Sequence, residues 1–355
     1  AGIGDRSPSR GLGDVYKRQD IAGESEPFNL RVHRDDGGIR TRLAPDGGLL
    51  ITASGGLLQL WQLEDRKPGS GTGLDLSALA LDRSGRVAAL GFRDGNVSVL
   101  TTSQLENGGY SQEEVDYIGH QGSVSSIVVD TLRGSVVSGG DDGTVRIWDI
   151  ASGAPLELFM RHAAGPVNAV ALSPDGQWIL SAAESSARLW NMADGELVTQ
   201  VTTNGAALAV SFSPQAERFV VGDSAGNLFF ESLKEVLPRR LARAQDSILA
   251  LAYSPDGEFL ASGDMSGRVQ LWDPESAAAL GEPWKFPHPI RWLGFTEGDG
   301  YLIVQTDHWL HRLLVESQTL SIYDSRMLEV GTCLLYTSDA ADEGLGVDLG
   351  GRRII

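Results

Sequence analysis

Residues 118–150 read IGHQGSVSSIVVDTLRGSVVSGGDDGTVRIWDI, and this stretch decides the fold. It contains three short runs rich in β-branched residues, at 124–129, 135–137 and 144–148. Between the second and third runs lies Asp141-Asp142-Gly143, which is typical of a tight turn between antiparallel strands. We therefore predict three consecutive antiparallel strands in this stretch.

Two dipeptides bracket these strands, Gly119-His120 and Trp148-Asp149. At a spacing of about thirty residues they resemble the signature of one blade in the WD-repeat, G-protein-beta-like propeller family, here of a bacterial type. The resemblance implies a hydrogen-bonded structural tetrad made of His120, Ser138, Asp142 and Trp148. Pairing these groups would avoid a cost of roughly 1–3 kcal/mol for each buried polar group left alone. A catalytic triad would also need room for a reacting atom beside it, so we predict a structural role and no catalytic residue.

The same pattern recurs with a period of about 40 residues. Blades are predicted near residues 39–66, 74–117, 118–160, 161–201, 204–240, 242–284 and 287–325. We therefore predict an all-β fold, a seven-bladed β-propeller of four-stranded antiparallel blades, because closing the ring leaves only short sheet edges. The outer strand that closes the ring could come from residues 28–32 or 319–323, and the sequence leaves this choice open.

The copies differ in how much of the tetrad they keep. Only the blade at 118–160 carries the whole set. In the next blade His162 stands one residue out of register, and in the sixth Ala244 replaces the histidine. Residues 101–117 are acidic and polar, and we interpret them as an exposed outer strand with an excursion.

One position in the first strands is small in most copies. It holds Ala78, Ser126, Ala169, Ala209 and Ala250, but Trp292 in the last. Small residues suit strands crowded around a central axis. Trp292 either fills a wider gap or forms a plug or ligand platform in the channel.

Both ends of the chain differ from the rest. Residues 9–19, SRGLGDVYKRQ, and 333–343, CLLYTSDAADE, resemble translated adapters of a transposon-based sequencing library. We therefore predict that residues 1–19 and 333–355 are adapter-derived and disordered. The propeller then occupies residues 20–332, as a metagenomic fragment of a bacterial protein.

Charge and cysteine content exclude several classes of function. The net charge is −18, and it stays so without the flanks, which carry six basic and six acidic residues. This argues against binding nucleic acid or an anionic membrane surface, which both need clustered Lys and Arg. The single cysteine, Cys333, lies in a flank, so we expect no disulfide, no thiol nucleophile and no cysteine metal site. Since the other motifs also have structural interpretations, we expect no bound metal and no cofactor. We expect a cytoplasmic domain that is monomeric.

Two motifs suggest chemistry but have a simpler interpretation. Residues 222–226, GDSAG, match G-x-S-x-G, but a β-type run follows where a hydrolase needs a helix. His308 and His311 are three apart on a strand pattern, so they point to opposite faces and do not form a metal pair.

The predicted propeller gives a candidate partner site. In the family that the sequence resembles, first strands start on the face that carries the second turns, which we name the top face. The residues that open these strands would surround the channel mouth: Arg40, Ser77, Ser125, Asn168, Arg291 and Trp292. Arg and Trp are frequent in binding hot spots, so we predict that these residues bind a protein or peptide. Acids at the second turns would favour a partner of mixed or basic charge: Asp141, Glu184, Asp223, Asp264 and Asp307. Alternatively, Arg40 and Arg291 only pair with those acids.

The resemblance thus implies a non-catalytic protein–protein interaction scaffold that uses the top face and the channel mouth. One alternative is the sensor or targeting module of a larger bacterial signalling NTPase or kinase. A second alternative is a propeller enzyme.

Overall fold

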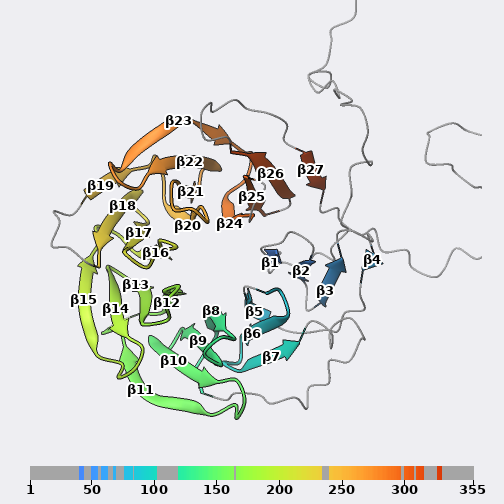
Figure 1. Ribbon diagram of the computed structural model, residues 1–355, viewed down its shortest axis with the longest axis vertical. Helices are drawn as coiled ribbons and strands as arrows, with labels where there is room; N and C mark the ends of the chain where they lie inside the picture. The colour runs from blue at the N-terminus through green and yellow to red at the C-terminus, as the bar shows by residue number, and fades with distance from the viewer. Residues whose placement is uncertain are drawn as a thin grey trace, which may run out of the picture.

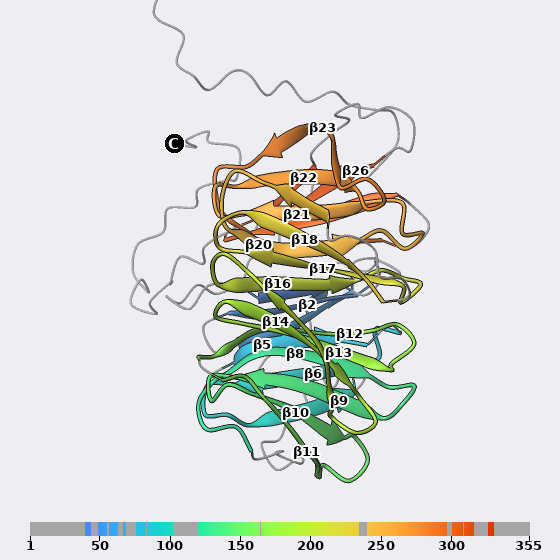
Figure 2. The same cartoon turned by 90° about the vertical axis from the view of Figure 1, so that its left-hand side faces the viewer.

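Short antiparallel sheets stand around a central axis in the computed structural model (Figure 1). The structure describes residues 40–43, 49–54, 57–62, 67–68, 76–82, 84–101, 119–163, 165–233, 240–296, 300–307, 309–315 and 326–329. The adapter-like flanks, and the possible closing strands 28–32 and 319–323, lie outside these residues. The side view shows the sheets following one another face to face around the ring (Figure 2).

Each sheet is named by its first and innermost strand. The β1 sheet has β1 (Arg40–Leu43), β2 (Leu49–Ser54), β3 (Leu57–Gln62) and β4 (Lys67–Pro68). The β5 sheet has β5 (Leu76–Leu81), β6 (Val87–Phe92) and β7 (Val97–Thr101). The β8 sheet has β8 (Val124–Asp130), β9 (Ser135–Gly140), β10 (Thr144–Asp149) and β11 (Pro155–Arg161). The β12 sheet has β12 (Val167–Leu172), β13 (Trp178–Ala183), β14 (Ser186–Asn191) and β15 (Leu197–Thr202).

The remaining sheets follow the same order. The β16 sheet has β16 (Ala207–Phe212), β17 (Arg218–Asp223), β18 (Asn227–Ser232) and β19 (Arg240–Arg243). The β20 sheet has β20 (Ile248–Tyr253), β21 (Leu260–Asp264), β22 (Arg268–Asp273) and β23 (Ala278–Lys285). The β24 sheet has β24 (Ile290–Phe295), β25 (Tyr301–Thr306), β26 (Trp309–Leu314) and β27 (Arg326–Glu329).

The prediction of an all-β propeller is confirmed, but the prediction of seven four-stranded blades is wrong. Within the described residues there are six four-stranded blades, and the β5 sheet contains three strands. A fourth strand on β7 would have to come from residues 102–118, which lie outside the described residues. That stretch is polar and acidic, with Gly108-Gly109 in its middle, and it lacks the β-branched run that favours a strand.

Glycines in the second strands allow neighbouring sheets to approach closely. A Cβ on Gly222 would lie 2.4 Å from Ile248 Cγ2, on the first residue of the next sheet. Three other junctions repeat this pairing: Gly91 with Val124, Gly139 with Val167, and Gly263 with Ile290. Between the β12 and β16 sheets the equivalent positions hold Ala182 and Ala207, which belong to one buried apolar cluster. A small residue therefore faces a β-branched one, or two alanines share the same space.

Most first strands begin with a β-bulge, in which one extra residue stands opposite the second strand. The extra residues are Ser77, Ser125, Asn168, Leu208, Leu249 and Arg291. Four of these six bulge residues are among the predicted partner-binding residues, so the bulge decides where those side chains point.

We expect the close glycine contacts to limit which substitutions the junctions between sheets tolerate. Gly222→Ala should lower the free energy of unfolding by roughly 1–3 kcal/mol, because the added methyl overpacks the junction. Ile248→Ala alone should cost roughly 2–5 kcal/mol, through the cavity that it leaves. The double variant copies the Ala182–Ala207 junction, so chemical denaturation should show a loss smaller than the sum of the two. The reverse exchange, Ala182→Gly with Ala207→Val, is the matched control and should also be better tolerated than Ala207→Val alone. Strictly additive losses in both cycles would contradict this account of the junctions.

Candidate functional site

The predicted tetrad residues lie together in the β8 sheet. Trp148 Nε1 donates to Ser138 Oγ at 2.8 Å, and His120 Nε2 lies 2.7 Å from the same oxygen. His120 Nδ1 lies 3.1 Å from Asp142 Oδ1. Burial raises the pKa of Asp142, but hydrogen bonds from Thr144 and from the Gln121 backbone outweigh it and lower this pKa to about 2. The ionised carboxylate can only accept, so the proton of neutral His120 lies on Nδ1 and Ser138 donates to Nε2.

This arrangement is closed to a substrate. Ser138 and Trp148 are fully buried, and the Ser138 hydroxyl both accepts and donates. Burial lowers the pKa of His120, although the neighbouring Asp142 opposes this change. The buried polar atoms therefore satisfy one another and hold the loop before β8 against β9 and β10.

Parts of the tetrad recur in other sheets. His162 Nε2 lies 2.7 Å from Ser181 Oγ, and Trp190 Nε1 donates to the same oxygen at 2.8 Å. His162 does stand one residue out of register, five residues before β12 where His120 stands four before β8, yet it still reaches the serine of its own sheet. In the β20 sheet Trp272 Nε1 donates to Ser262 Oγ at 2.8 Å.

Three of the six predicted partner-binding residues use their polar atoms in hydrogen bonds to the backbone, so these atoms are not available to a partner. Ser77 Oγ donates to the backbone oxygen of Val124 at 2.7 Å, and Asn168 Nδ2 to that of Ala207 at 2.8 Å. Ser125 Oγ donates to the backbone oxygen of Val167. Each of these bulge side chains therefore ties its first strand to the first strand of the next sheet.

The other three predicted residues lie on the first and last sheets. The side chain of Arg40 lies outside the described part of the structure, although its backbone begins β1. Arg291 Nε lies 2.6 Å from Asp307 Oδ1, so this arginine does pair with a second-turn acid. Both groups remain partly exposed, at 45% and 31% of their side-chain surface.

Trp292 lies between the last and first sheets. The Arg42 guanidinium carbon on β1 is 5.5 Å from the centre of the indole. Along β24 the indole covers Gly294, where a Cβ would be 2.3 Å from the ring atom Cη2. Two features of this contact were missing from the sequence interpretation: Arg42, which stacks on the ring, and Gly294, which leaves room for it.

A cavity of about 490 Å³ occupies this end of the channel. Its wall includes two leucines at bulge positions, Leu208 and Leu249, together with Arg42, Arg291 and Trp292. Ser125 and Asn168 line the opposite side, with their polar atoms turned to the backbone. The channel mouth is therefore apolar and cationic on one side and hydrogen-bonded internally on the other.

The second-turn acids contribute less negative surface than the sequence suggested. Asp223 and Asp264 are buried, and they accept hydrogen bonds from the backbone of their own turns. Asp307 is paired with Arg291. Of the five acids, only Asp141 and Glu184 are exposed, so these two are the ones that add to the negative surface.

The other candidate motifs have structural settings. Ser224 of the G-x-S-x-G match lies in the turn between strands β17 and β18, where its hydroxyl accepts from the Ala206 backbone at 2.9 Å. Among the described residues, no three His, Cys, Asp or Glu side chains stand in position to hold a metal ion. Nor does that part of the chain contain a helix long and apolar enough to cross a membrane. His308 lies outside it.

His311 is a buried imidazole with no polar partner in the described part of the structure. Its two ring nitrogens have no hydrogen bond there, and its ring centre lies 4.5 Å from that of Phe286. Burial, and then His288, lowers the pKa of His311 to about 4. Burial, and then Arg188, lowers the pKa of His162 to the same value.

We expect His120→Ala and Trp148→Ala each to destabilise the β8 sheet. Removing the buried indole should cost roughly 3–5 kcal/mol, and removing His120 roughly 1–3 kcal/mol because Ser138 and Asp142 lose a partner. The double variant should lose less than the sum, since both residues bond the same hydroxyl. Denaturant unfolding measures this coupling, and additive losses would mean that the four groups do not act together.

We also expect stability to fall in mild acid. Below a pH of about 6.5 the unfolded chain protonates His162 and His311, whereas the folded chain resists this until a pH of about 4. Above a pH of about 6.5 these two histidines therefore do not reduce the free energy of unfolding. As the pH falls from about 6.5 to about 4, the free energy of unfolding declines. His311→Leu should make this decline shallower by about 1.4 kcal/mol per pH unit, and at neutral pH it should not destabilise the fold. Leu313→Ala, from the same strand, should lower stability at every pH without changing the slope. An unchanged slope in His311→Leu would show that His311 titrates normally.

Comparison with known proteins supports a repeat propeller. Residues 69–232 match the family described as Nucleolar protein 10-like, N-terminal domain, and residues 237–273 match the WD domain, G-beta repeat. Small ribosomal subunit protein RACK1 of Medicago sativa and RACK1z of Arabidopsis thaliana are each 28% identical over 154 residues, covering 43% of this chain and 40% of theirs. Telomerase protein component 1 of Mus musculus is 25% identical over 267 residues, covering 70% of this chain and 10% of its own.

These relatives are plant and animal proteins, so the comparisons do not support the predicted bacterial origin. The matched segment covers two fifths of each RACK1 protein and a tenth of the mouse protein. The matches, the partial recurrence of the tetrad and the sheet order together support the WD40-repeat propeller family for this chain.

Proposed function

We propose that the chain is a non-catalytic protein–protein interaction scaffold that binds a partner at the top face and the channel mouth. The observation that carries this proposal is the group formed by Arg42, Trp292 and Arg291 above a cavity of about 490 Å³. A large aromatic ring and two guanidinium groups are the side chains most frequent in binding hot spots.

The relatives add support of a general kind. The plant proteins are named as small ribosomal subunit proteins, and the mouse protein as a telomerase protein component. Each name describes a member of a larger assembly, as expected for a scaffold. The geometry of the tetrad agrees, because its serine is buried behind Trp148 and offers no nucleophile.

The mouth favours a peptide segment of mixed charge. A carboxylate of the partner would compete with Asp307 for Arg291, whose side chain is still partly exposed. An apolar side chain of the partner would lie between Leu208, Leu249 and Trp292. Basic groups further out would face Asp141 and Glu184, which are exposed at the second turns.

We expect Arg291→Ala/Trp292→Ala to lose this binding. Short peptides selected from a display library on the wild-type chain should bind this variant about thirtyfold more weakly, which corresponds to a hot-spot loss of about 2 kcal/mol. The matched control, Leu241→Ala/Arg243→Ala on strand β19, removes an exposed leucine and an exposed arginine away from the channel and should bind normally. Thermal unfolding of both variants separates lost binding from lost folding. Selected peptides that bind both variants as tightly as wild type would place the partner site elsewhere.

A further inference from the structure

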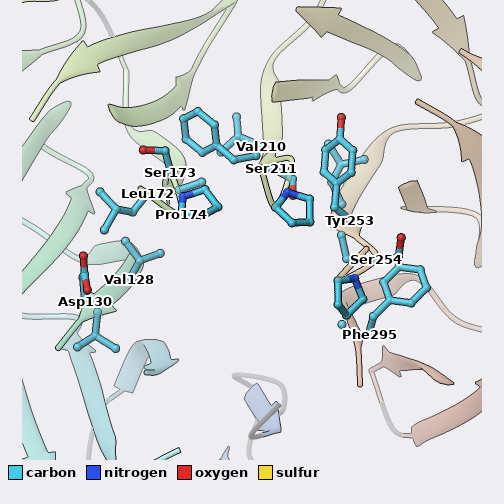
Figure 3. A pocket seen from close by; sticks show the side chains of 18 of the residues that line it. Val128, Asp130, Leu172, Ser173, Pro174, Val210, Ser211, Tyr253, Ser254 and Phe295 are labelled. Atoms are coloured by element: carbon cyan, nitrogen blue, oxygen red, sulfur yellow. The ribbon is translucent and has the colours of Figure 1, made fainter. Parts of the chain in front are cut away.

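A second cavity, of about 560 Å³, lies at the opposite end of the channel (Figure 3). Its wall is made by the last residues of the first strands and by the first turns, on the face that we name the bottom face. Figure 3 shows Pro174, Val210 and Phe295 around it. The two cavities share Val128, Val129, Val210 and Leu251 inside the channel, but the turn residues at this opening, Leu132, Pro174, Pro214 and Pro255, do not line the upper cavity.

The rim of this cavity is apolar. Four first turns each place an apolar residue on the cavity wall: Pro174, Pro214 and Pro255 at one shared turn position, and Leu132 one residue further along its own turn. Leu132 is 83% exposed, the highest value among the exposed large hydrophobic residues of the described structure. A single exposed leucine needs no explanation, but one that joins three prolines and Phe295 around a cavity forms a continuous apolar rim.

The polar groups next to this rim are already used by the turns. Ser173 Oγ donates to Asp175 Oδ1 at 2.5 Å and accepts from the Trp178 backbone at 2.9 Å. Ser254 makes the same two kinds of bond, to Asp256 and from Phe259. These two hydroxyls are therefore already bonded within the turns, whereas the Tyr253 hydroxyl, which also lines the cavity, is buried with no hydrogen-bond partner in the described structure.

The turn holds Leu132 in its exposed position. Its backbone nitrogen donates to Asp130 Oδ1 at 3.1 Å. The next residue, Arg133, forms an ion pair with Asp130 at 2.8 Å and donates to the backbone oxygen of Asp175 on the neighbouring sheet. The leucine is therefore presented on a backbone that is fixed from both sides, which lowers the entropy lost on binding.

Acidic residues surround this apolar rim. They stand in or beside the bottom turns at Asp130, Asp149, Asp175, Asp194, Glu196, Glu217, Asp256, Glu258, Asp273 and Glu275, whereas Asp82 is buried and bonded within its own turn. The basic residues with described side chains at the same turns are Arg86, Arg133 and Arg218. Two of these are paired with carboxylates, Arg133 with Asp130 and Arg218 with Glu275. The described part of the bottom face thus combines an apolar opening with an excess of negative charge.

We propose that this opening is a second binding site, which takes an extended segment of a partner protein with an apolar side chain flanked by Lys or Arg. The apolar side chain enters between Leu132, Pro255 and Phe295. The flanking cations face Glu217, Glu258 and the other turn acids. The acidic residues raise the association rate of a basic segment, and the apolar contact lowers its dissociation rate.

The test uses three fluorescein-labelled peptides of equal length: Lys-Lys-Leu-Lys-Lys, Lys-Lys-Ser-Lys-Lys and Glu-Glu-Leu-Glu-Glu. Fluorescence anisotropy measures their binding to the full chain, to Leu132→Ser, and to Leu241→Ser as a matched control. Leu241 is also an exposed leucine, at 56%, but it lies on the outer strand β19. A fourth protein, Glu217→Gln/Glu258→Gln, tests the charges.

The Lys-Leu peptide should bind wild type and Leu241→Ser equally, and Leu132→Ser about tenfold more weakly. Glu217→Gln/Glu258→Gln should weaken binding about threefold in about 0.1 M salt and have little effect in about 1 M salt. The Lys-Ser and Glu-Leu peptides should bind at least about tenfold more weakly than the Lys-Leu peptide. Arg291→Ala, which keeps the indole over Gly294, should bind it like wild type, so this result stands whether or not the top site fails.

Three results would overturn the proposal. Equal binding of the Lys-Leu peptide to Leu132→Ser and wild type would remove the rim from the site. Equal binding of the Lys-Leu and Lys-Ser peptides would reduce the interaction to charge alone. Self-association of the wild-type chain that Leu132→Ser abolishes, seen by analytical ultracentrifugation, would assign the opening to a second copy of the chain.

Discussion

The close approach between each second strand and the first residue of the next sheet is the constraint on which the rest of the structure depends. A Cβ added to Gly222 would lie 2.4 Å from Ile248 Cγ2, so the two sheets could not approach this closely with a larger residue at this position. Four junctions use glycine against Val or Ile, and the junction of Ala182 and Ala207 distributes the same volume differently. With the junctions fixed, the first strands stand at a set distance from the axis, and the channel width follows.

The bulges then divide the channel mouth into two sides. Where the bulge residue is Ser77, Ser125 or Asn168, a side-chain hydrogen bond to the next first strand closes the junction from above. Where it is Leu208 or Leu249, no such bond can form, and the side chain instead becomes part of the cavity wall. The residue type at the β-bulge therefore decides its role. A polar residue bonds to the next first strand, and a leucine contributes apolar surface to the upper cavity.

This division explains what the sequence could and could not predict. Ser138 and Trp148 were predictable because the hydrogen-bonding needs of a buried indole and hydroxyl are met within one repeat. The roles of Ser77 and Asn168 were not predictable, because their acceptors are backbone oxygens on the following repeat, which carry no sequence signal.

The remaining differences between prediction and structure come from the length of one loop and from the burial of acidic side chains. His162 seemed displaced because an alignment counts residues, whereas one extra residue in a loop leaves the ring in the same place. The buried caps Asp223 and Asp264 look like exposed Asp141 in sequence, although they add little to the surface potential. The outer strand predicted within residues 101–117 is not tested, because residues 102–118 lie outside the described part of the structure.

Trp292 connects the two ends of the channel physically. The indole lines the upper cavity, and Gly294, which it covers, lines the lower one. The two cavities also share wall residues, among them Val128, Val210 and Leu251. A ligand that displaced the indole from above would change the space available below, whereas one that only met Arg291 at the rim would not. We therefore expect coupling between the two faces to involve the position of this ring, which lines the upper cavity and covers Gly294 in the wall of the lower one.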